Sequence, residues 1–416
     1  MSVPFDPPPS PKKPVVALIK IAATPYWLHL HRRIDREMPE IELHCLYLYD
    51  TGDQPWGAQE QDVRPVCFGK PGVSDADTPL RTLKRDWNKA GRIIEWLKKN
   101  EAHATVIGGY HNVGSLRLFG WCHSRRVRCF LTGDSNIRGD NVTGMKRRLK
   151  TAVIHWVFSR SSGVMPFGTA GRNYFLKYGA DPKRVFYFPG EPDYSIFENL
   201  GQPDLDAACR DFDLRKGRRR LVYCGRLISL KRVDLLLAAF VAVARRRPDW
   251  DLVIVGDGVL RQELAAQVPD VLKDRVKWTG FVGDQKRIAG VYRNCDVLVL
   301  PSDRDAWALV VNEGLAAGLA VVTSDVIGAS DDLVRPGVNG FTFPHGDAEA
   351  LTECLLKVTD PEQIDSYKRA SASILAEWRK RGDPVKGLRQ ALEATNVIPP
   401  AGDGEHPKLV PPRRAA

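Results

Sequence analysis

The sequence predicts an α/β protein built from two doubly wound domains that face each other. The chain has 416 residues, which is too long for one ordinary hydrophobic core. Apolar strand-like runs alternate with amphipathic helical patterns, as in parallel sheets covered by helices on both faces. The alternation stops around residues 201–220 and then begins again, which indicates a second domain of similar design.

The first half opens with a proline-rich segment and then alternates strands with helices. The expected strands are 15–23, 41–49, 104–110 and 126–134, and the expected helices are 24–40 and 81–100. Each strand is a short apolar run bounded by polar or glycine residues, whereas the helices space their apolar residues three or four apart.

The second half repeats this alternation after a stretch rich in glycine, proline and charge. Its expected strands are 219–226, 251–258, 276–282, 296–302 and 320–326, and its expected helices are 233–248, 310–318 and 349–359. The domain prediction is a disordered tail 1–14, an N-terminal domain 15–197, a linker 198–217, a C-terminal domain 218–365, helices 366–396 that cross back to the N-terminal domain, and a disordered tail 397–416.

The composition is that of a soluble globular protein, with 43% hydrophobic and 27% charged residues. No stretch is long and apolar enough to span a membrane, and the start lacks the pattern of a secretory signal. The eight cysteines show no CxxC or zinc-like spacing, so we expect reduced core residues in a cytoplasmic protein. The net charge of +11 favours anionic partners, among them nucleotides, lipid head groups and nucleic acid.

Two cations follow the strand 219–226, at a place where ligands bind in open α/β sheets. The strand ends at Gly225, and Arg226 and Lys231 follow within the loop and the start of the next helix. Fixed cations at such a point suit a diphosphate. The alternative is that both are ordinary solvated residues of a basic protein.

Two carboxylates are placed around the start of the helix expected after the strand 296–302. Asp305 lies at its mouth, with the helix expected to begin near 306–308, and Glu313 follows eight residues later. Over a helix this spacing is about 12 Å, which is too far for an acid and base acting on one bond but suits the two ends of a nucleotide-sugar. The N–H groups of Ala308, Leu309 and Val310 are expected to hold the phosphates between them. The alternative makes Asp305 a helix cap and Glu313 a solvated residue.

Two further strand ends carry glycine turns, in IVGDG (254–258) and WTGFV (278–282). Backbone atoms there are placed to recognise the edge of a base, which makes Gly256, Phe281 and Val282 the residues expected near it. A glycine turn after a strand is common, so neither turn is specific alone.

Taken together, the motifs CGRL…K, VIVGDG, VKWTGFV, DVLVLPS, D-x7-E and GVNGFTF resemble the C-terminal half of the family 4 glycosyltransferases over about residues 219–360. The resemblance implies the GT-B fold of two Rossmann-like domains. It also implies a retaining, metal-independent transfer from a nucleotide-sugar, with no cofactor. Glu313 matches the second glutamate of the family's Glu-x7-Glu motif, expected on the ribose, and Asp305 stands at the first, expected on the donor sugar. Arg226 and Lys231 match its diphosphate-binding pair.

The same resemblance bears on two other acidic positions. Asp332 corresponds to a further acidic residue of the family. Asp303 and Asp305 form a D-x-D string, which binds manganese in unrelated glycosyltransferases. Because the D-x7-E spacing already accounts for Asp305, we expect no metal.

The N-terminal half resembles the family less, and we expect it to bind the acceptor. Relatives have a glycine-rich turn after the first strand, where this chain has AATPYW with Tyr26. Asp134 lies near a position where relatives often carry a histidine, and it is a candidate for orienting an acceptor hydroxyl or stabilising a cationic sugar. Helix capping is the equally weighted alternative. His111 is a second acceptor-side candidate at a strand end.

Residues 144–160 combine cations with apolar side chains on one expected helix. Lys146, Arg147 and Arg148 accompany Leu149 and Trp156. Such a helix suits an anionic membrane surface, or else packs its apolar stripe on the sheet. A lipid-linked acceptor and peripheral attachment at the inner face of the membrane are therefore hypotheses. The basic run RKGRRR (215–220) lacks the interleaved aromatics of a nucleic-acid surface, so we expect no nucleic-acid partner.

The sequence therefore predicts a retaining glycosyltransferase for a glycan, lipid-linked or other small acceptor, in polysaccharide or glycolipid synthesis. Two alternatives remain open at this point. One is a nucleotide-sugar epimerase or hydrolase of the same fold, and the other is a non-catalytic protein that binds nucleotide-sugars.

Overall fold

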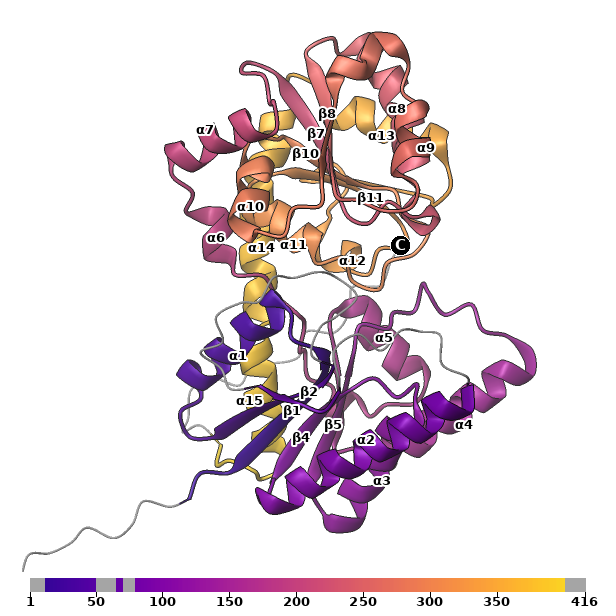
Figure 1. Ribbon diagram of the computed structural model, residues 1–416, viewed down its shortest axis with the longest axis vertical. Coiled ribbons are helices and arrows are strands. Elements are labelled where there is room, and N and C mark those ends of the chain that lie inside the picture. Colours follow the sequence, from indigo (N-terminus) through magenta and orange to yellow (C-terminus); the bar gives the residue numbers. More distant parts are fainter. Residues whose placement is uncertain (1–11, 50–64, 70–78, 401–416) are drawn as a thin grey trace, which may run out of the picture.

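The structure, a computed structural model, describes residues 12–49, 65–69 and 79–400, and it contains two α/β domains stacked end to end (Figure 1). Each domain has a six-stranded parallel sheet. The N-terminal sheet has the order β3-β2-β1-β4-β5-β6, and the C-terminal sheet has the order β12-β11-β10-β7-β8-β9. The two domains therefore repeat one topology, and the predicted pair of doubly wound domains is confirmed.

The N-terminal domain alternates strands and helices from Val15 to Lys177. Its strands are β1 (Val15–Ala22), β2 (Glu42–Tyr49), β3 (Val66–Cys67), β4 (Ala104–Gly108), β5 (Arg128–Gly133) and β6 (Gly163–Pro166). Its helices are α1 (Pro25–Glu37), α2 (Pro79–Lys99), α3 (Val113–Arg125), α4 (Gly144–Phe158) and α5 (Thr169–Lys177).

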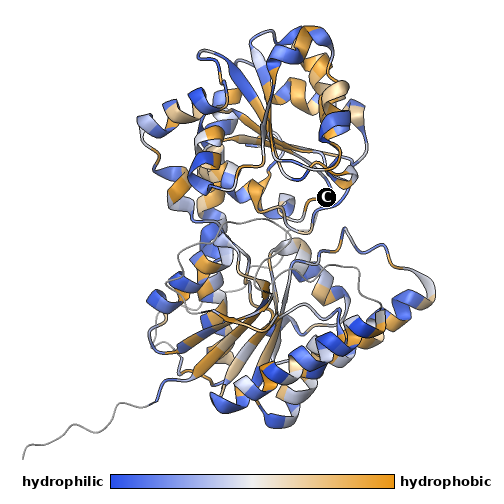
Figure 2. Cartoon of the chain, in the orientation of Figure 1, coloured by the Kyte–Doolittle hydropathy of each residue, from blue (hydrophilic) through white to orange (hydrophobic). Residues whose placement is uncertain are grey.

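Both faces of the N-terminal sheet are covered because side chains alternate along β1. Val15, Ala17 and Ile19 pack into one buried cluster with residues of α2 and α3, whereas Val16 and Leu18 pack into a second cluster with α1. A continuous apolar run is what a strand with two buried faces requires. In Figure 2 the strands are mostly hydrophobic and the helices show mixed, largely hydrophilic faces.

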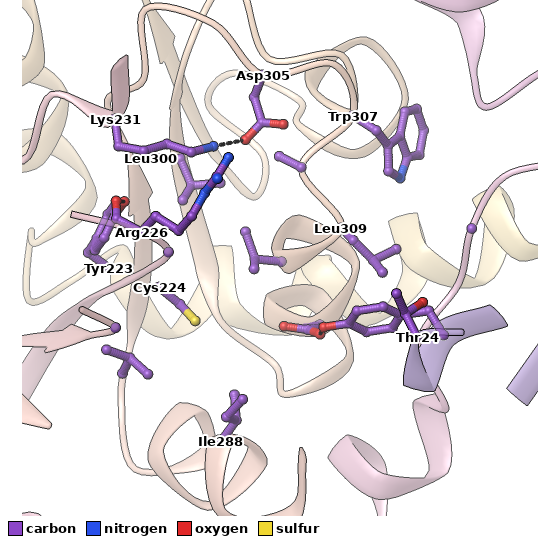
Figure 3. A pocket seen from close by; sticks show the side chains of 18 of the residues that line it. Thr24, Tyr223, Cys224, Arg226, Lys231, Ile288, Leu300, Asp305, Trp307 and Leu309 are labelled. Carbon is purple, nitrogen blue, oxygen red and sulfur yellow. Dashed lines mark hydrogen bonds and ion pairs between the residues drawn. The ribbon is translucent and has the colours of Figure 1, made fainter. Parts of the chain in front are cut away.

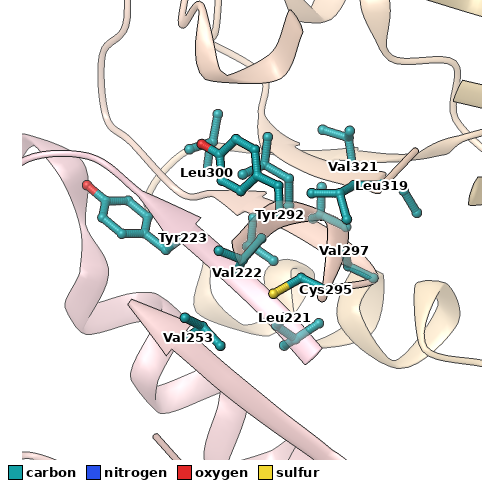
Figure 4. Packing of buried hydrophobic residues seen from close by; sticks show 14 of the residues in the cluster. Leu221, Val222, Tyr223, Val253, Tyr292, Cys295, Val297, Leu300, Leu319 and Val321 are labelled. Carbon is teal, nitrogen blue, oxygen red and sulfur yellow. The ribbon is translucent and has the colours of Figure 1, made fainter. Parts of the chain in front are cut away.

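The C-terminal domain has the same organisation. Its strands are β7 (Arg219–Cys224), β8 (Trp250–Val255), β9 (Val276–Gly280), β10 (Val297–Leu300), β11 (Ala320–Ser324) and β12 (Gly340–Phe343). Its helices are α6 (Tyr194–Glu198), α7 (Gln202–Asp211), α8 (Val233–Arg246), α9 (Arg261–Ala266), α10 (Gln285–Arg293), α11 (Val310–Ala316), α12 (Ser330–Leu333) and α13 (Ala348–Val358). Leu221, Val253, Val297 and Val321 from four adjacent strands meet in its core (Figure 4).

The last two helices connect the domains. Helix α14 (Ile364–Arg381) packs on the C-terminal domain through Ile374 and Trp378. Helix α15 (Pro384–Ala394) packs on α1 and buries Leu388 and Leu392 in the core of the N-terminal domain. The chain therefore passes between the domains twice, after β6 and again at the junction of α14 and α15 (Figure 1).

Residues 198–217 are not a linker, contrary to the prediction from composition. Half of this stretch is helix α7, which packs on α10 and buries Ala208 against Gly290. Tyr194, Phe197 and Leu214 on either side of α7 belong to the C-terminal core. The charges that suggested a linker are used inside the domain, since Arg218 pairs with Asp251.

The predicted tails lie mostly outside the described residues. Of 1–14 only residues 12–14 are described, and of 397–416 only 397–400, among which Ile398 is buried in the N-terminal core. Five cysteines are buried as expected, but Cys67 is exposed. Across the described part of the chain, no helix is long and apolar enough to cross a membrane.

Candidate active site

A cavity of about 410 Å³ lies between the two domains at the carboxyl ends of both sheets. Every predicted site residue except His111 lines it: Tyr26 and Asp134 from the N-terminal domain, and Arg226, Lys231, Gly256, Phe281, Val282, Asp305, Ala308, Leu309, Val310 and Glu313 from the C-terminal domain. Residues spread over almost 290 positions of sequence therefore meet at one place.

The sheet topology explains this convergence. In the C-terminal sheet, β7 and β10 are neighbours, and the chain progresses outward from them in opposite directions. Such a switch point opens a crevice beyond the strand ends, where ligands of doubly wound sheets bind. Arg226 follows β7 and Asp305 follows β10, so both flank this crevice. In the N-terminal sheet, β1 and β4 form the equivalent point, and Tyr26 follows β1.

The turn after β8 brings its backbone against the turn after β7. Gly256 has φ of 128°, and a Cβ atom built there would lie 2.0 Å from the carbonyl oxygen of Gly225. Only glycine allows the two turns to approach this closely. The glycine predicted near the base thus has a packing reason as well as a place in the cavity lining.

Arg226 and Lys231 point into the same part of the cavity (Figure 3). The Lys231 ammonium forms an ion pair with the carboxylate of Asp305. The Arg226 side chain is exposed in the cleft, and no ion pair links its guanidinium to the described residues. One cation is thus held in position by an acidic neighbour, while the other is available to an anion.

The loop between β10 and α11 departs from the prediction. The helix begins at Val310 rather than near 306–308, because Ala308 adopts a left-handed conformation with φ of 67° that interrupts it. Asn136 of the N-terminal domain donates from its side-chain amide to the carbonyls of Asp305 and Ala306, at 3.2 and 2.9 Å. The loop is therefore held from both domains.

Glu313 lies at the bottom of the cavity and is only 2% exposed. Its Oε1 accepts a hydrogen bond of 2.9 Å from the hydroxyl of Tyr26, and its Oε2 accepts one of 3.3 Å from Tyr292. Burial raises the pKa of Glu313 to about 7, against the opposing effect of the two hydroxyls. It is neither solvated nor a helix-surface residue, so that alternative is wrong.

Asp134 faces Asp305 from the N-terminal side of the cleft. Its side chain is open to the cleft, but atoms of both domains surround it, so desolvation raises its pKa, and the negative charge of Asp305 adds to the rise. His111 is not part of the cavity lining. Its ring packs on Tyr110 at 4.3 Å, and burial lowers its pKa.

Several aromatic residues of the site and one buried cation were not predicted from the sequence. The cavity is also lined by Trp27, Phe167 and Trp307. The rings of Phe167 and Trp307 meet edge to face, with their centroids 6.4 Å apart. Behind Trp27, the ammonium of Lys20 lies 3.7 Å from its ring centroid, and the residue is 4% exposed. Burial lowers the pKa of Lys20 to about 7. A lysine inside the strand run VVALIKIAA was the visible signal.

The acidic D-x-D string is divided between two ion pairs. Asp303 pairs with Arg232, whereas Asp305 pairs with Lys231. Among the residues that the structure describes, no group of three or more His, Cys, Asp or Glu side chains is arranged to hold a metal ion. Metal independence remains a prediction.

Asp332 has a role between the domains. Its carboxylate is buried and accepts hydrogen bonds from the backbone N–H and the hydroxyl of Thr169, at 2.8 and 2.6 Å, and it also contacts Arg381. It thus caps the start of α5 from the opposite domain.

Comparison with known proteins agrees with this architecture. Residues 218–360 match the model of the family Glycosyl transferases group 1. The D-inositol 3-phosphate glycosyltransferase of Rhodococcus erythropolis is 31% identical over 251 residues, covering 57% of this chain and 54% of that protein. A GDP-mannose-dependent alpha-mannosyltransferase of Mycolicibacterium smegmatis is 34% identical over 197 residues, covering 44% of this chain and 48% of that protein. The chain spans about half the length of these curated relatives.

The fold likeness extends over nearly the whole chain. The sucrose-phosphate synthase of Thermosynechococcus elongatus superposes with a TM-score of 0.71 over 92% of this chain and 100% of that one, at 16% identity. The chain thus has the GT-B fold, and its residues 218–360 match the family Glycosyl transferases group 1.

Proposed function

We propose that this chain is a retaining glycosyltransferase that moves a sugar from a nucleotide-sugar to a hydroxyl of a glycan, lipid-linked or other small acceptor. The observation that carries the proposal is the cavity between the domains. Arg226, Lys231 and Glu313 line one side of it, and Asp134 lies on the other. Two cations suit a diphosphate, a buried carboxylate suits ribose hydroxyls, and the N-terminal side is left for the acceptor.

The residues suit a transfer in which the diphosphate leaves the sugar. The bond from the anomeric carbon to the phosphate oxygen breaks with its electrons going to the phosphate, while the acceptor oxygen bonds to that carbon. The acceptor's proton passes to the departing phosphate oxygen. Arg226 and Lys231 are placed to stabilise the growing negative charge. Asp305, held by Lys231, is the residue that we expect at the donor sugar, and it is one methylene shorter than the glutamate of the family pattern.

Donor binding is the first test. We expect one of UDP-, GDP- and ADP-sugars to raise the unfolding midpoint by several degrees, because saturating ligand at about 100 times its Kd stabilises the fold by about 2.7 kcal/mol. Arg226→Ala and Glu313→Ala should lose this shift. Arg245→Ala should keep it, since Arg245 is an exposed cation at the end of α8, away from the cavity.

Transfer is the second test. Asp134→Ala should keep the donor-induced shift and lose transfer to an acceptor, since Asp134 lies on the acceptor side of the cavity. Conversion of the nucleotide-sugar without any acceptor would instead indicate an epimerase or hydrolase. Donor binding without turnover over a panel of glycans and lipid-linked sugars would indicate a binding protein.

A lipid-linked acceptor is the finer part of the proposal, and helix α4 supports it. Ile154 and Val157 face the sheet and are fully buried, whereas Met145 and Leu149 are 74% and 68% exposed. Lys146, Arg147 and Arg148 are exposed between them, but Lys150 is held by Asp140. Exposed apolar groups among exposed cations suit an anionic bilayer surface.

This surface is testable with vesicles of phosphatidylglycerol and phosphatidylcholine. We expect the protein to sediment with them at low salt and less so at high salt. The double variant Met145→Glu with Leu149→Glu should remain in the supernatant. Val271→Glu is the matched control, because Val271 is 87% exposed but belongs to the other domain. No sedimentation of the unchanged protein would reject the membrane part while leaving donor transfer intact.

A further inference from the structure

A hydrogen bond between two side chains crosses the cavity and joins the two domains at the donor site. The hydroxyl of Tyr26, at the start of α1, donates to Oε1 of Glu313 in α11 at 2.9 Å. Both side chains line the same cavity. The N-terminal domain therefore contacts the carboxylate that the proposed function assigns to the donor's ribose.

The two tyrosines on Glu313 differ in origin. Tyr292 belongs to α10 of the same domain, is fully buried, and donates to Oε2. It holds the carboxylate in place whatever the other domain does. Tyr26 reaches in from across the cleft, and its contact with Glu313 depends on how the domains sit. The Tyr292 hydroxyl thus stays on Glu313 in any arrangement of the domains, whereas the Tyr26 hydroxyl can be replaced by another donor.

A ribose hydroxyl offers the same chemistry as the tyrosine hydroxyl, namely one O–H donor toward a carboxylate oxygen. Glu313 is only 2% exposed, so little space remains beside Oε1. Next to the Tyr26 hydroxyl lies Gln285, whose amide nitrogen is buried and is a hydrogen-bonding neighbour of that hydroxyl. A ribose in place of Tyr26 would bring oxygen acceptors to that nitrogen.

We propose that Tyr26 occupies the ribose position on Glu313 in the donor-free protein, and that the donor displaces it. This inference rests on the proposed function and adds a regulation of the same site. Displacement turns the Tyr26 side chain at the start of α1, and Trp27, the next residue, also lines the cavity. Donor binding therefore rearranges a side chain that borders the acceptor side of the cavity.

The test compares Tyr26→Phe with Tyr292→Phe by calorimetric titration. The probe is whichever of UDP, GDP and ADP stabilises the unchanged protein most. Tyr26→Phe should tighten its Kd about fivefold, because the competing hydrogen bond is gone. Tyr292→Phe also removes a hydroxyl that donates to the Glu313 carboxylate, and it should weaken binding of the probe or leave it unchanged. Each variant loses one hydroxyl and keeps its ring, so packing is preserved.

The outcomes separate this inference from the proposed function. Weaker or unchanged binding in Tyr26→Phe would overturn the displacement, since Tyr26 would then be a donor contact or irrelevant to it. If Glu313→Gln binds the probe as tightly as the unchanged protein, the ribose assignment fails, and the displacement fails with it. If no nucleoside diphosphate binds the unchanged protein, the proposed function itself is rejected.

Discussion

Burial shifts the pKa of Glu313, Asp134 and Lys20 toward the neutral form of each side chain, although Asp134 is open to the cleft. Glu313 and Lys20 both reach values of about 7, from opposite directions. Glu313 inside the cavity and Lys20 behind Trp27 therefore titrate near neutral pH, so the charge around the cavity, and with it the binding of an anionic donor, depends on pH.

Replacing Glu313 by Gln tests the cost of this buried charge. Burial raises the pKa of Glu313 in the folded state above its unfolded value, so its contribution to stability is complete below about pH 4.5 and is lost as the pH rises through about 7. Gln does not titrate. At pH 8 we expect Glu313→Gln to raise the free energy of unfolding by on the order of 3 kcal/mol and therefore to unfold at a higher temperature than the unchanged protein. The difference should shrink toward pH 5. If the unfolding temperatures of the two proteins differ by the same amount from pH 5 to pH 8, Glu313 does not have a raised pKa in the folded state.

Site residues that follow a strand end could be predicted from the sequence. Contacts between side chains that are distant in the sequence could not. Arg226, Lys231 and Glu313 line the cavity because they follow strands at the edge where ligands bind. Tyr26 was expected on the acceptor side, but its hydroxyl reaches Glu313 in the other domain. A pair 287 residues apart leaves no local pattern, so the three-dimensional arrangement of the domains was needed to find it.

Among elements, buried strands were the easiest to predict and irregular loops the hardest. The runs at 15–23 and 296–302 correspond to β1 and β10, because a strand buried on both faces is apolar throughout. The start of α11 was misplaced because Ala308 adopts a positive φ, which no residue preference foretells for alanine. Helix α7 was mistaken for a linker because glycine, proline and charge also suit a short capped helix.

The turns after β8 and β9 offer a matched pair of glycine substitutions. Gly256 and Gly280 both have positive φ, at 128° and 70°, but a Cβ atom at Gly256 would collide with Gly225, whereas nothing lies within 4 Å at Gly280. We expect Gly280→Ala to cost about 1–2 kcal/mol from its left-handed conformation alone. Gly256→Ala should cost more than about 3 kcal/mol and also weaken donor binding, because the turns that line the cavity must separate. Equal unfolding midpoints for the two variants would show that the turns are not tightly packed.

For the molecule as a whole, the two segments that pass between the domains are tied to one arginine. Arg33 in α1 contacts Glu191 in the first segment, and it bonds to Asp383 in the second at 3.1 Å. Glu191 is 5% exposed, and burial raises its pKa although Arg33 opposes the rise. A shared partner for both segments suits a hinge about which the domains open and close.

Arg33→Met tests this arrangement. The variant leaves Glu191 buried beside His29, at 4.0 Å, and near the negative charge of Asp383, so we expect a loss of about 2–3 kcal/mol at pH 8. The loss should be smaller at pH 5, because a carboxyl whose pKa is raised in the folded state stabilises less as the pH rises through that pKa. Arg36→Met is the control, since Arg36 is 72% exposed and pairs only with the neighbouring Glu37 within the described part of the chain; it should change the unfolding midpoint by less than about 1 °C.

If both segments depend on Arg33, small-angle scattering of Arg33→Met should also give a larger radius of gyration without donor, which saturating donor reverses. An unfolding midpoint and a radius matching those of Arg36→Met would mean that Arg33 is an ordinary surface residue and that the hinge is held by packing alone.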